Sequence, residues 1–264
     1  MTSYLKCIKI INDKISKKRM LDGESVFGTW CMLPSSFVAD VISSTKIDFL
    51  IIDMEHGTMT FETAEDMVRA AQLKNCQPII RVGDSHENTI LHALETGCGA
   101  VMVPHVSTSE VAKKIANASR YAPLGNRGLS PYTRCHDYTH ENLSESLIKH
   151  AEETLVGILV EGNEGIKNLP EIAKVDGIDF IYLGMYDISQ SIGLPGELEN
   201  PKVLDQLNKC LKIIKDAGKL AGTFSRDIEA CRTFKKMGFE FIAYLADSNA
   251  IRTFYLNAIK QYKK

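Results

Sequence analysis

The sequence predicts a (β/α)8 barrel, and two observations carry this prediction. Eight short apolar runs recur along the 264 residues, and amphipathic segments with helical spacing separate them. Near-continuous apolar runs are typical of parallel strands that are buried on both faces. Strand–helix alternation repeated eight times favours a closed barrel in a chain of this length. The runs cover residues 25–32, 48–56, 77–82, 99–106, 154–162, 179–187, 219–225 and 239–247.

The alternative fold is an open, doubly wound parallel sheet. Nucleotide-binding sheets of this kind carry GxGxxG or GxxxxGK[ST] after an early strand, and neither motif occurs in the expected place. Eight strands also close into a barrel that leaves no sheet edge. We therefore expect a single (β/α)8 barrel domain over residues 1–264, without an internal linker.

The segments between the runs carry apolar stripes of helical period. Ser107-Thr-Ser-Glu110 fits a capping box at the start of one helix, and Gly218 and Gly238 end two later helices. A stripe before the first run predicts an N-terminal helix that caps the bottom of the barrel. The stripes comprise Leu5, Ile8, Ile11 and Ile15; Ala64, Met67, Val68 and Ala71; Val111, Ile115 and Ala118; Val203, Leu207, Leu211 and Ile214; and Ile228, Cys231 and Phe234.

One connection, between Val106 and Thr154, is much longer than the others. After a helix it contains an irregular stretch over residues 121–145 that is rich in proline, glycine, arginine and histidine. Long irregular connections inside a compact domain usually form lids or contact partners. We expect one of these two roles for the stretch.

The composition excludes several function classes. Lys and Arg total 31 against 33 Asp and Glu, a formal charge of −2, so no strong field favours nucleic acid or anionic lipid. No apolar run approaches 18 residues, and the N-terminus lacks a secretory pattern. The seven cysteines are scattered without CxxC spacing, which predicts reduced, packed thiols. We expect a cytoplasmic protein with no nucleic-acid or membrane partner.

Ionisable residues end several of the apolar runs, where a barrel of this type builds its active site. Glu161 lies at the end of the fifth run, and Asp187 lies at the end of the sixth. Two carboxylates on successive strands suit a hard divalent cation such as Mg²⁺ or Mn²⁺, which binds carboxylates, waters and substrate oxygens. Alternatively, each carboxylate caps the following helix or pairs with an arginine.

Arg81 ends the third run, and its planar guanidinium suits a small carboxylate or oxyanion. Neutralising Glu161 or Asp53 is a compatible role. His56 follows the second run, and Asp53, three residues earlier, could orient its ring as a general base. His86, His105, His136 and His140 are weaker candidates, and no HExxH pair indicates zinc. Gly162 and Gly165, in EGNEG, permit a tight anion-binding loop or an ordinary turn.

Several strand-end strings, taken in order, resemble a known family. They are IIDMEHG, QPIIRV, ETG before AVMVPHV, YAPLGNRG, LVEG and YLGMYDISQSIG. Their order and spacing are similar to those of the HpcH/HpaI aldolases, class II pyruvate-dependent aldolases of the pyruvate/phosphoenolpyruvate barrel type. The resemblance runs from about Gly28 to Asp247.

The resemblance implies an aldehyde-lyase that cleaves a 4-hydroxy-2-oxo acid, or 2-keto-3-deoxy sugar acid, to pyruvate and an aldehyde through a metal-bound pyruvate enolate. Homohexamers are usual in the family. The cation is Mg²⁺ or Mn²⁺, and Co²⁺ also fits. The implied assignments are Glu161 and Asp187 for metal; His56, Arg81, Asp53 and Glu95 for catalysis, with Glu95 as acidic partner of His56; and Arg81, Gly184, Met185 and Tyr186 for substrate.

The chain departs from the family pattern in the substrate loop and in the acidic partner of the histidine. Met185 stands where the family has proline, and Tyr186 adds bulk near the metal. Glu95 replaces a shorter aspartate. From these departures we expect the part of the site that binds the aldehyde to differ from that of other family members.

Three other functions stay open. A CoA-ester lyase of the citrate-lyase β type shares the barrel and the metal pair, and a lyase or hydrolase could act on phosphorylated pyruvate analogues. A barrel retained only as an interaction module is the third, although the retained chemical groups argue against it. No lysine ends a strand in a Schiff-base position, which excludes the class I aldolase route.

Overall fold

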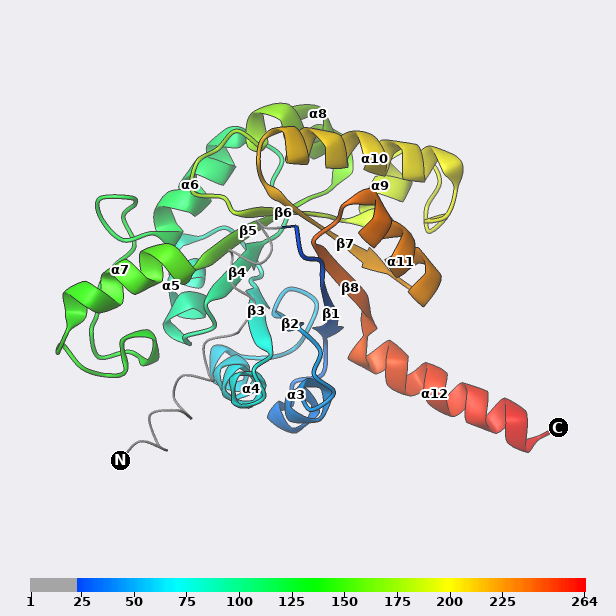
Figure 1. The fold of residues 1–264 in the computed structure, drawn as a ribbon, viewed down its shortest axis with the longest axis horizontal. Helices are drawn as coiled ribbons and strands as arrows, with labels where there is room; N and C mark the ends of the chain where they lie inside the picture. The colour runs from blue at the N-terminus through cyan, green and yellow to red at the C-terminus, as the bar shows by residue number, and fades with distance from the viewer. Residues whose placement is uncertain (1–22) are drawn as a thin grey trace.

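A closed parallel barrel forms the centre of the computed structural model, which describes residues 23–264 (Figure 1). Strand β1 pairs with both β2 and β8, so the sheet closes and the open-sheet alternative is wrong. All eight strands lie within the apolar runs of the sequence. They are β1 Val26–Cys31, β2 Phe49–Asp53, β3 Gln77–Arg81, β4 Ala100–Val103, β5 Leu155–Val160, β6 Phe180–Leu183, β7 Leu220–Ser225 and β8 Phe241–Ala246.

Helices connect the strands and cover the outside of the barrel. The expected stripes are buried on α4 and α10. On α6 and α11 they are buried except that Val111 is half-buried and Ile228 is exposed. The capping prediction was displaced by one residue. Thr108, rather than Ser107, caps α6 by accepting the Val111 N–H at 3.3 Å. The helices are α3 Ser36–Ser43, α4 Phe61–Leu73, α5 Glu87–Glu95, α6 Ser109–Ser119, the 3₁₀ turn η2 Arg134–His136, α7 Leu143–Glu153, α8 Gly162–Ile172, α9 Met185–Ser191, α10 Pro201–Asp216, α11 Ile228–Met237 and α12 Asp247–Tyr262.

Aromatic side chains fill the inside of the barrel. Phe180 and Phe241 stack with ring centroids 4.8 Å apart, and Phe49 meets Phe241 edge-on at 5.5 Å. The absence of a side chain at Gly157 leaves room for the Phe180 ring, because a Cβ there would lie 2.0 Å from that ring. A second apolar layer separates the strands from the helices. The interior is therefore a packed core that supports the strand ends.

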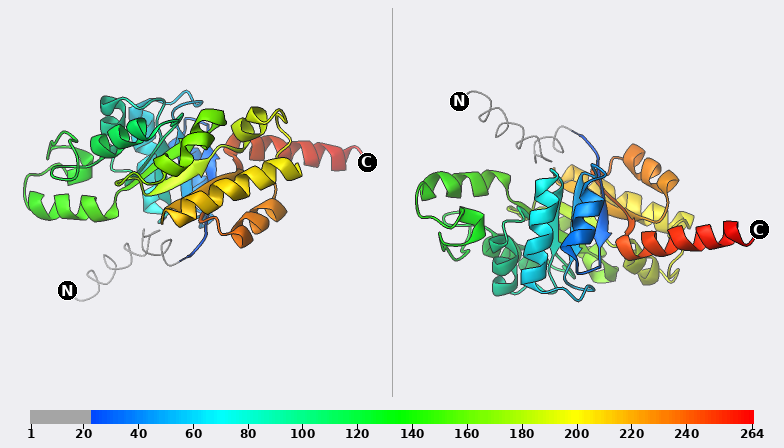
Figure 2. Two further views of the ribbon diagram at one scale, coloured as in Figure 1. Left: turned by 90° about the horizontal axis from the view of Figure 1, so that it is seen from above. Right: turned by 90° about the horizontal axis from the view of Figure 1, so that it is seen from below.

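The long connection lies at the end of the barrel opposite the mouth. Helix α6 returns the chain to the N-terminal ends of the strands, and β5 starts there after α7. The irregular stretch and α7 project from this end (Figures 1 and 2). The connection therefore does not cover the mouth of its own barrel, and a partner contact stays a prediction for it.

Helix α12 extends away from the barrel in all three views (Figures 1 and 2). Its first residue, Asp247, anchors it by accepting the backbone N–H groups of Met32 at 3.0 Å and Leu33 at 3.1 Å. No helix within residues 23–264 is both long and apolar enough to cross a membrane. The predicted N-terminal capping helix lies outside the described residues.

Candidate active site

A continuous row of ionisable side chains crosses the mouth of the barrel from β2 to α9. Each member comes at or just after the end of a strand, where parallel topology brings the chain to the same face. Ion pairs and short polar contacts join neighbours along the row. In order, the row contains Asp53, Arg81, Glu55, His105, Glu161 and Asp187.

Arg81 and Asp53 form a buried pair across adjacent strands. They are register partners on β3 and β2, and Asp53 accepts from Arg81 Nε at 2.8 Å and from Nη2. The Arg81 guanidinium carbon also lies 4.4 Å from the centroid of the Trp30 ring. Trp30 in turn donates to the Tyr182 hydroxyl at 3.3 Å. A fork-on-fork pair over an aromatic face holds the guanidinium in one orientation and engages two of its five N–H donors. A third nitrogen, Nη1, lies 3.0 Å from Glu55.

Glu161 and Asp187 meet over Gly184, at the ends of β5 and β6. A Cβ built on Gly184 would lie 3.0 Å from Glu161 Oε2 and 3.5 Å from Asp187 Oδ2, so a side chain at this position would crowd the Glu161 carboxylate. Burial and the adjacent Asp187 carboxylate raise the pKa of Glu161 to about 7. Two acids held this close repel each other when both are ionised, and a divalent cation relieves that repulsion.

The donor set fits a hard divalent cation. Glu161 and Asp187 supply carboxylate oxygens, which are the ligand type that Mg²⁺ and Mn²⁺ bind. A nearby oxygen, Glu55 Oε2, is buried and has no hydrogen-bond partner of acceptable geometry among the described residues, although it lies 3.0 Å from Arg81 Nη1. Such an atom can accept a hydrogen bond from a bound water or ligand.

His105 occupies the middle of the row, although from the sequence it was only one of the weaker candidates. Its ring nitrogens lie 2.7 Å from Glu55 Oε1 and 2.7 Å from Glu161 Oε1. The one available signal was that PHV follows an apolar run in the same way as the stronger candidates do.

His56 lies at the same face, on the exposed turn after β2. The expected pairing of its ring with Asp53 is not what the structure shows. Asp53 receives the backbone N–H of His56 at 3.2 Å and that of Glu55 at 3.0 Å, and Arg81 takes the rest of the carboxylate. The buried Asp53 carboxylate is paired with the permanent cation of Arg81 and with backbone N–H donors, and the side chain of His56 lies in solvent.

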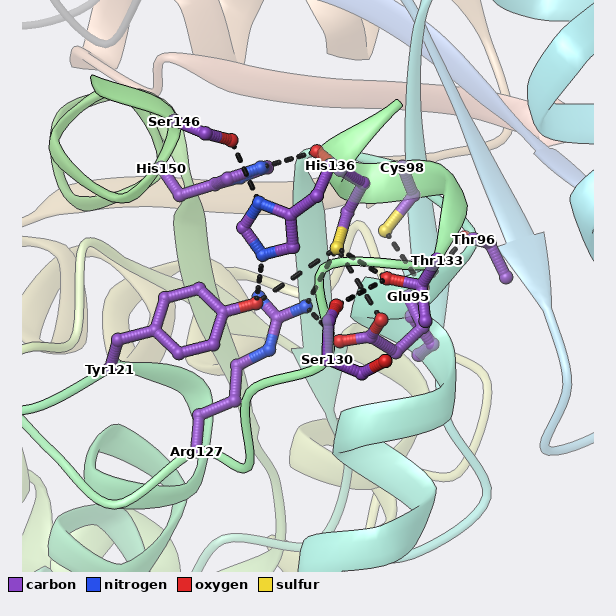
Figure 3. A network of polar contacts seen from close by, with 12 residues as sticks. Glu95, Thr96, Cys98, Tyr121, Arg127, Ser130, Thr133, His136, Ser146 and His150 are labelled. Atoms are coloured by element: carbon purple, nitrogen blue, oxygen red, sulfur yellow. Dashed lines mark hydrogen bonds and ion pairs between the residues drawn. The ribbon is translucent and has the colours of Figure 1, made fainter. Parts of the chain in front are cut away.

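Glu95, the expected acidic partner of His56, lies elsewhere. It ends α5 and therefore precedes β4, at the end of the barrel opposite His56. There it accepts from Arg127 at 2.7 Å (Figure 3). Glu95 and His56 are therefore not paired within one chain, because they lie at opposite ends of the barrel. The sequence motif alone did not show that helix α5 carries Glu95 to the other end.

The surroundings of Glu95 form a hydrogen-bonded network that pins the long connection (Figure 3). His136 contacts the Tyr121 hydroxyl at 2.9 Å and the Ser146 hydroxyl at 2.7 Å, and His150 contacts the Cys135 carbonyl at 2.6 Å. Burial lowers the pKa of both histidines. Potential metal-ligand atoms of Cys135, His136 and His150 lie within 4.8 Å of one another. Both ring nitrogens of His136 are engaged in these bonds, however, and Arg127 lies 3.4 Å from the Cys135 sulfur, which disfavours a cation.

The predicted substrate residues of the loop after β6 separate into two groups. Gly184 lies beside the two acids and adds no side chain there, and Tyr186 is exposed and packs its ring 5.8 Å from that of Phe224. Met185 points into the core with 1% exposure, so its side chain is not available to a substrate. The first residue of a helix that packs on a barrel commonly turns inward, and here Met185 does so.

Comparisons with known proteins identify the family to which this chain belongs. The family model described as HpcH/HpaI aldolase/citrate lyase matches residues 27–253. The chain is 30% identical to a hydroxypyruvate/pyruvate aldolase from Chromohalobacter salexigens over 248 residues, 93% of this chain and 96% of that protein. It is also 30% identical to a 2-keto-3-deoxy-L-rhamnonate aldolase from Klebsiella pneumoniae, covering 88% of this chain and 86% of that protein.

A solved structure shows the same fold. It is a HpcH/HpaI aldolase/citrate lyase family protein from Burkholderia cenocepacia, which superimposes with a TM-score of 0.88 at 25% identity and covers 94% of this chain and 98% of its own. The extent of these matches and the row of ionisable side chains lead to one conclusion. The chain belongs to the HpcH/HpaI aldolase/citrate lyase family and is a carbon–carbon lyase built on a (β/α)8 barrel.

Proposed function

We propose that this chain is a divalent-metal-dependent class II aldolase that reversibly cleaves a 4-hydroxy-2-oxo acid into pyruvate and an aldehyde. The observation that carries the proposal is the meeting of Glu161 and Asp187 over Gly184, beside the fixed guanidinium of Arg81. Relatives named for pyruvate and 2-keto-3-deoxy-L-rhamnonate support the same substrate class.

The metal ligands and the buried arginine have different roles in the proposed reaction. Glu161 and Asp187 would hold the cation, which supplies Lewis-acid stabilisation of the negative charge that develops on the substrate oxygens. Arg81 directs its free N–H donors to the same oxygens, and Asp53 keeps the guanidinium from turning away. Because these donors are fixed before substrate binds, they need little reorganisation during the reaction.

His56 is the proposed proton acceptor. In cleavage, the proton of the C4 hydroxyl passes to His56, the C4–O bond becomes a carbonyl, and the C3–C4 bond breaks. The bonding electrons move to C3 and C2 as the enolate, which takes a proton at C3 to give pyruvate. The exposed position of His56 on the mouth supports exchange of this proton with solvent.

The test is exchange of the pyruvate methyl protons with deuterium, followed by NMR, with Mg²⁺, Mn²⁺ or Co²⁺ added. Glu161→Ala and Asp187→Ala should each abolish exchange, and Glu164→Ala, on the exposed first turn of α8, should leave it unchanged. Exchange that continues in EDTA would contradict the proposal. A screen of aldehydes with pyruvate, scored by product mass, would then identify the second substrate.

A CoA-ester lyase is the second candidate, because the matching family description includes citrate lyase. A thioester activity screen separates the two. The intact row of ionisable side chains supports an active enzyme over a barrel kept only as an interaction module.

We also propose that the chain forms a homo-oligomer, a hexamer by family resemblance, and that it works in the cytoplasm. Helix α12 supports the assembly, because it carries an apolar surface that its own barrel leaves uncovered. Phe254, Tyr255 and Tyr262 are 70%, 62% and 92% exposed. Rows of large apolar side chains on one projecting helix are typical of subunit contacts.

A further inference from the structure

We propose that His105 is a positioning residue that holds Glu161 in the orientation needed to bind a divalent cation, and so sets the affinity for that cation before any substrate binds. This inference rests on the proposed function, since it takes Glu161 and Asp187 as the metal ligands.

The contacts of His105 fix one oxygen of Glu161. Its Nδ1 lies 2.7 Å from Glu161 Oε1, and its backbone N–H donates to the same oxygen at 3.2 Å. Glu161 Oε2 is thereby left facing the space over Gly184, where Asp187 Oδ2 also lies. The side chain is therefore held from the β4 side and offers its second oxygen on the β6 side.

The backbone at His105 is adapted to this contact. His105 has a φ of +55°, in the left-handed region that non-glycine residues seldom occupy. It follows Pro104 directly after β4, and both its backbone N–H and its ring turn towards Glu161. Residues held in this region cost free energy and concentrate at functional sites.

The other side of the ring links the metal ligands to the substrate-binding arginine. His105 Nε2 lies 2.7 Å from Glu55 Oε1, and Glu55 Oε2 lies 3.0 Å from Arg81 Nη1. Loss of the ring would leave Glu55 and Glu161 as neighbouring carboxylates without the group between them. Both acids are mostly buried, with side-chain exposures of 10% and 9%, so solvent would screen their repulsion only weakly.

The size of the effect follows from the role. Removing a group that orients a metal ligand typically weakens metal binding by about 10- to 100-fold. The ring of His105 is 69% exposed, so water can replace part of its hydrogen bonding. We expect the lower end of this range, about 10-fold.

The experiment measures Mn²⁺ binding in the absence of pyruvate, by the loss of the free-ion EPR signal. Purified full-length wild type, His105→Ala, His105→Asn and His140→Ala would be compared. Asparagine tolerates the left-handed backbone and keeps one hydrogen-bonding group, so it should restore part of the affinity. His140 is an exposed histidine of the long connection and serves as the matched control.

We expect His105→Ala to raise the Mn²⁺ Kd about 10-fold, His105→Asn to lie between it and wild type, and His140→Ala to match wild type. A Kd for folded His105→Ala within about twofold of wild type would overturn the inference. Should His105→Ala fail to fold, His105→Asn decides: an unchanged Kd contradicts the inference and a raised Kd supports it.

Glu161→Gln separates this inference from the proposed function. If wild type and Glu161→Gln bind Mn²⁺ equally, or wild type binds none, the metal site itself is wrong. If Glu161→Gln loses binding and folded His105→Ala keeps it, only the role of His105 is wrong.

Discussion

Replacing Asp53 with asparagine tests the buried pair that holds Arg81. The Asp53 side chain is 1% exposed and that of Arg81 is 8% exposed, so neither charge can turn to water when its partner is lost. Asparagine can keep its oxygen on the two backbone N–H groups of the turn, but its NH₂ group then faces the guanidinium as a second donor. The fork-on-fork contact is lost while the cation stays buried.

Breaking a buried ion pair from one side costs about 3–5 kcal/mol. Arg81 keeps Glu55 at 3.0 Å and the Trp30 ring at 4.4 Å, which places the expected loss near the lower limit, about 3 kcal/mol. The assay is urea unfolding at pH 7, with wild type and variant at equal protomer concentration, because assembly would shift apparent stability.

The matched control is Asp66→Asn, which removes one of the two acidic partners of Arg69 from an exposed pair at 2.9 Å. Exposed pairs contribute about 0–1 kcal/mol, so this variant should unfold almost as wild type does. Equal losses for Asp53→Asn and Asp66→Asn would refute the assignment of Arg81 to a desolvated, oriented pair.

Three further predictions follow from other parts of the molecule. The raised pKa of Glu161 means that the metal-free folded state keeps a proton that the unfolded state releases. The stability of the protein in EDTA should therefore fall as pH rises from about 4.5 to about 7. A melting temperature of wild type that is flat across this window, or the same slope in Glu161→Gln, would contradict the prediction. Phe254→Asp should dissociate the assembly without unfolding the barrel, as measured by light scattering, and an unchanged molar mass would show that α12 does not join subunits. His136→Ala should cost about 1–3 kcal/mol because the Tyr121 and Ser146 hydroxyls lose their contacts with the ring at 2.9 and 2.7 Å, whereas its Mn²⁺ Kd should equal that of wild type; a weakened Kd would place the network in the metal site.

The barrel and its strand-end acids were predictable from the sequence because the signals are local. An apolar run followed by a carboxylate, as at Glu161 and Asp187, places that carboxylate at the mouth whenever the run is a parallel strand. The closed barrel makes the two strands neighbours. Little else is needed to bring the two acids together.

The predictions from the sequence that were wrong or incomplete concern features that depend on tertiary geometry. Glu95 was matched to His56 by motif, but the length of α5 carries it to the opposite end of the barrel, where Arg127 takes it. The importance of His105 arises from a left-handed backbone and from two acids on other strands, none of which its own sequence reports. Helix α7 was not predicted from the sequence, and none of its residues is fully buried in the structure.

The most direct measurement is anomalous diffraction from a crystal of the full chain soaked with Mn²⁺. A single strong peak within coordination distance of both Glu161 and Asp187 is the predicted result. A crystal with no peak over Gly184, or with its peak beside Cys135, His136 and His150, would contradict the assignment of the metal to the mouth of the barrel.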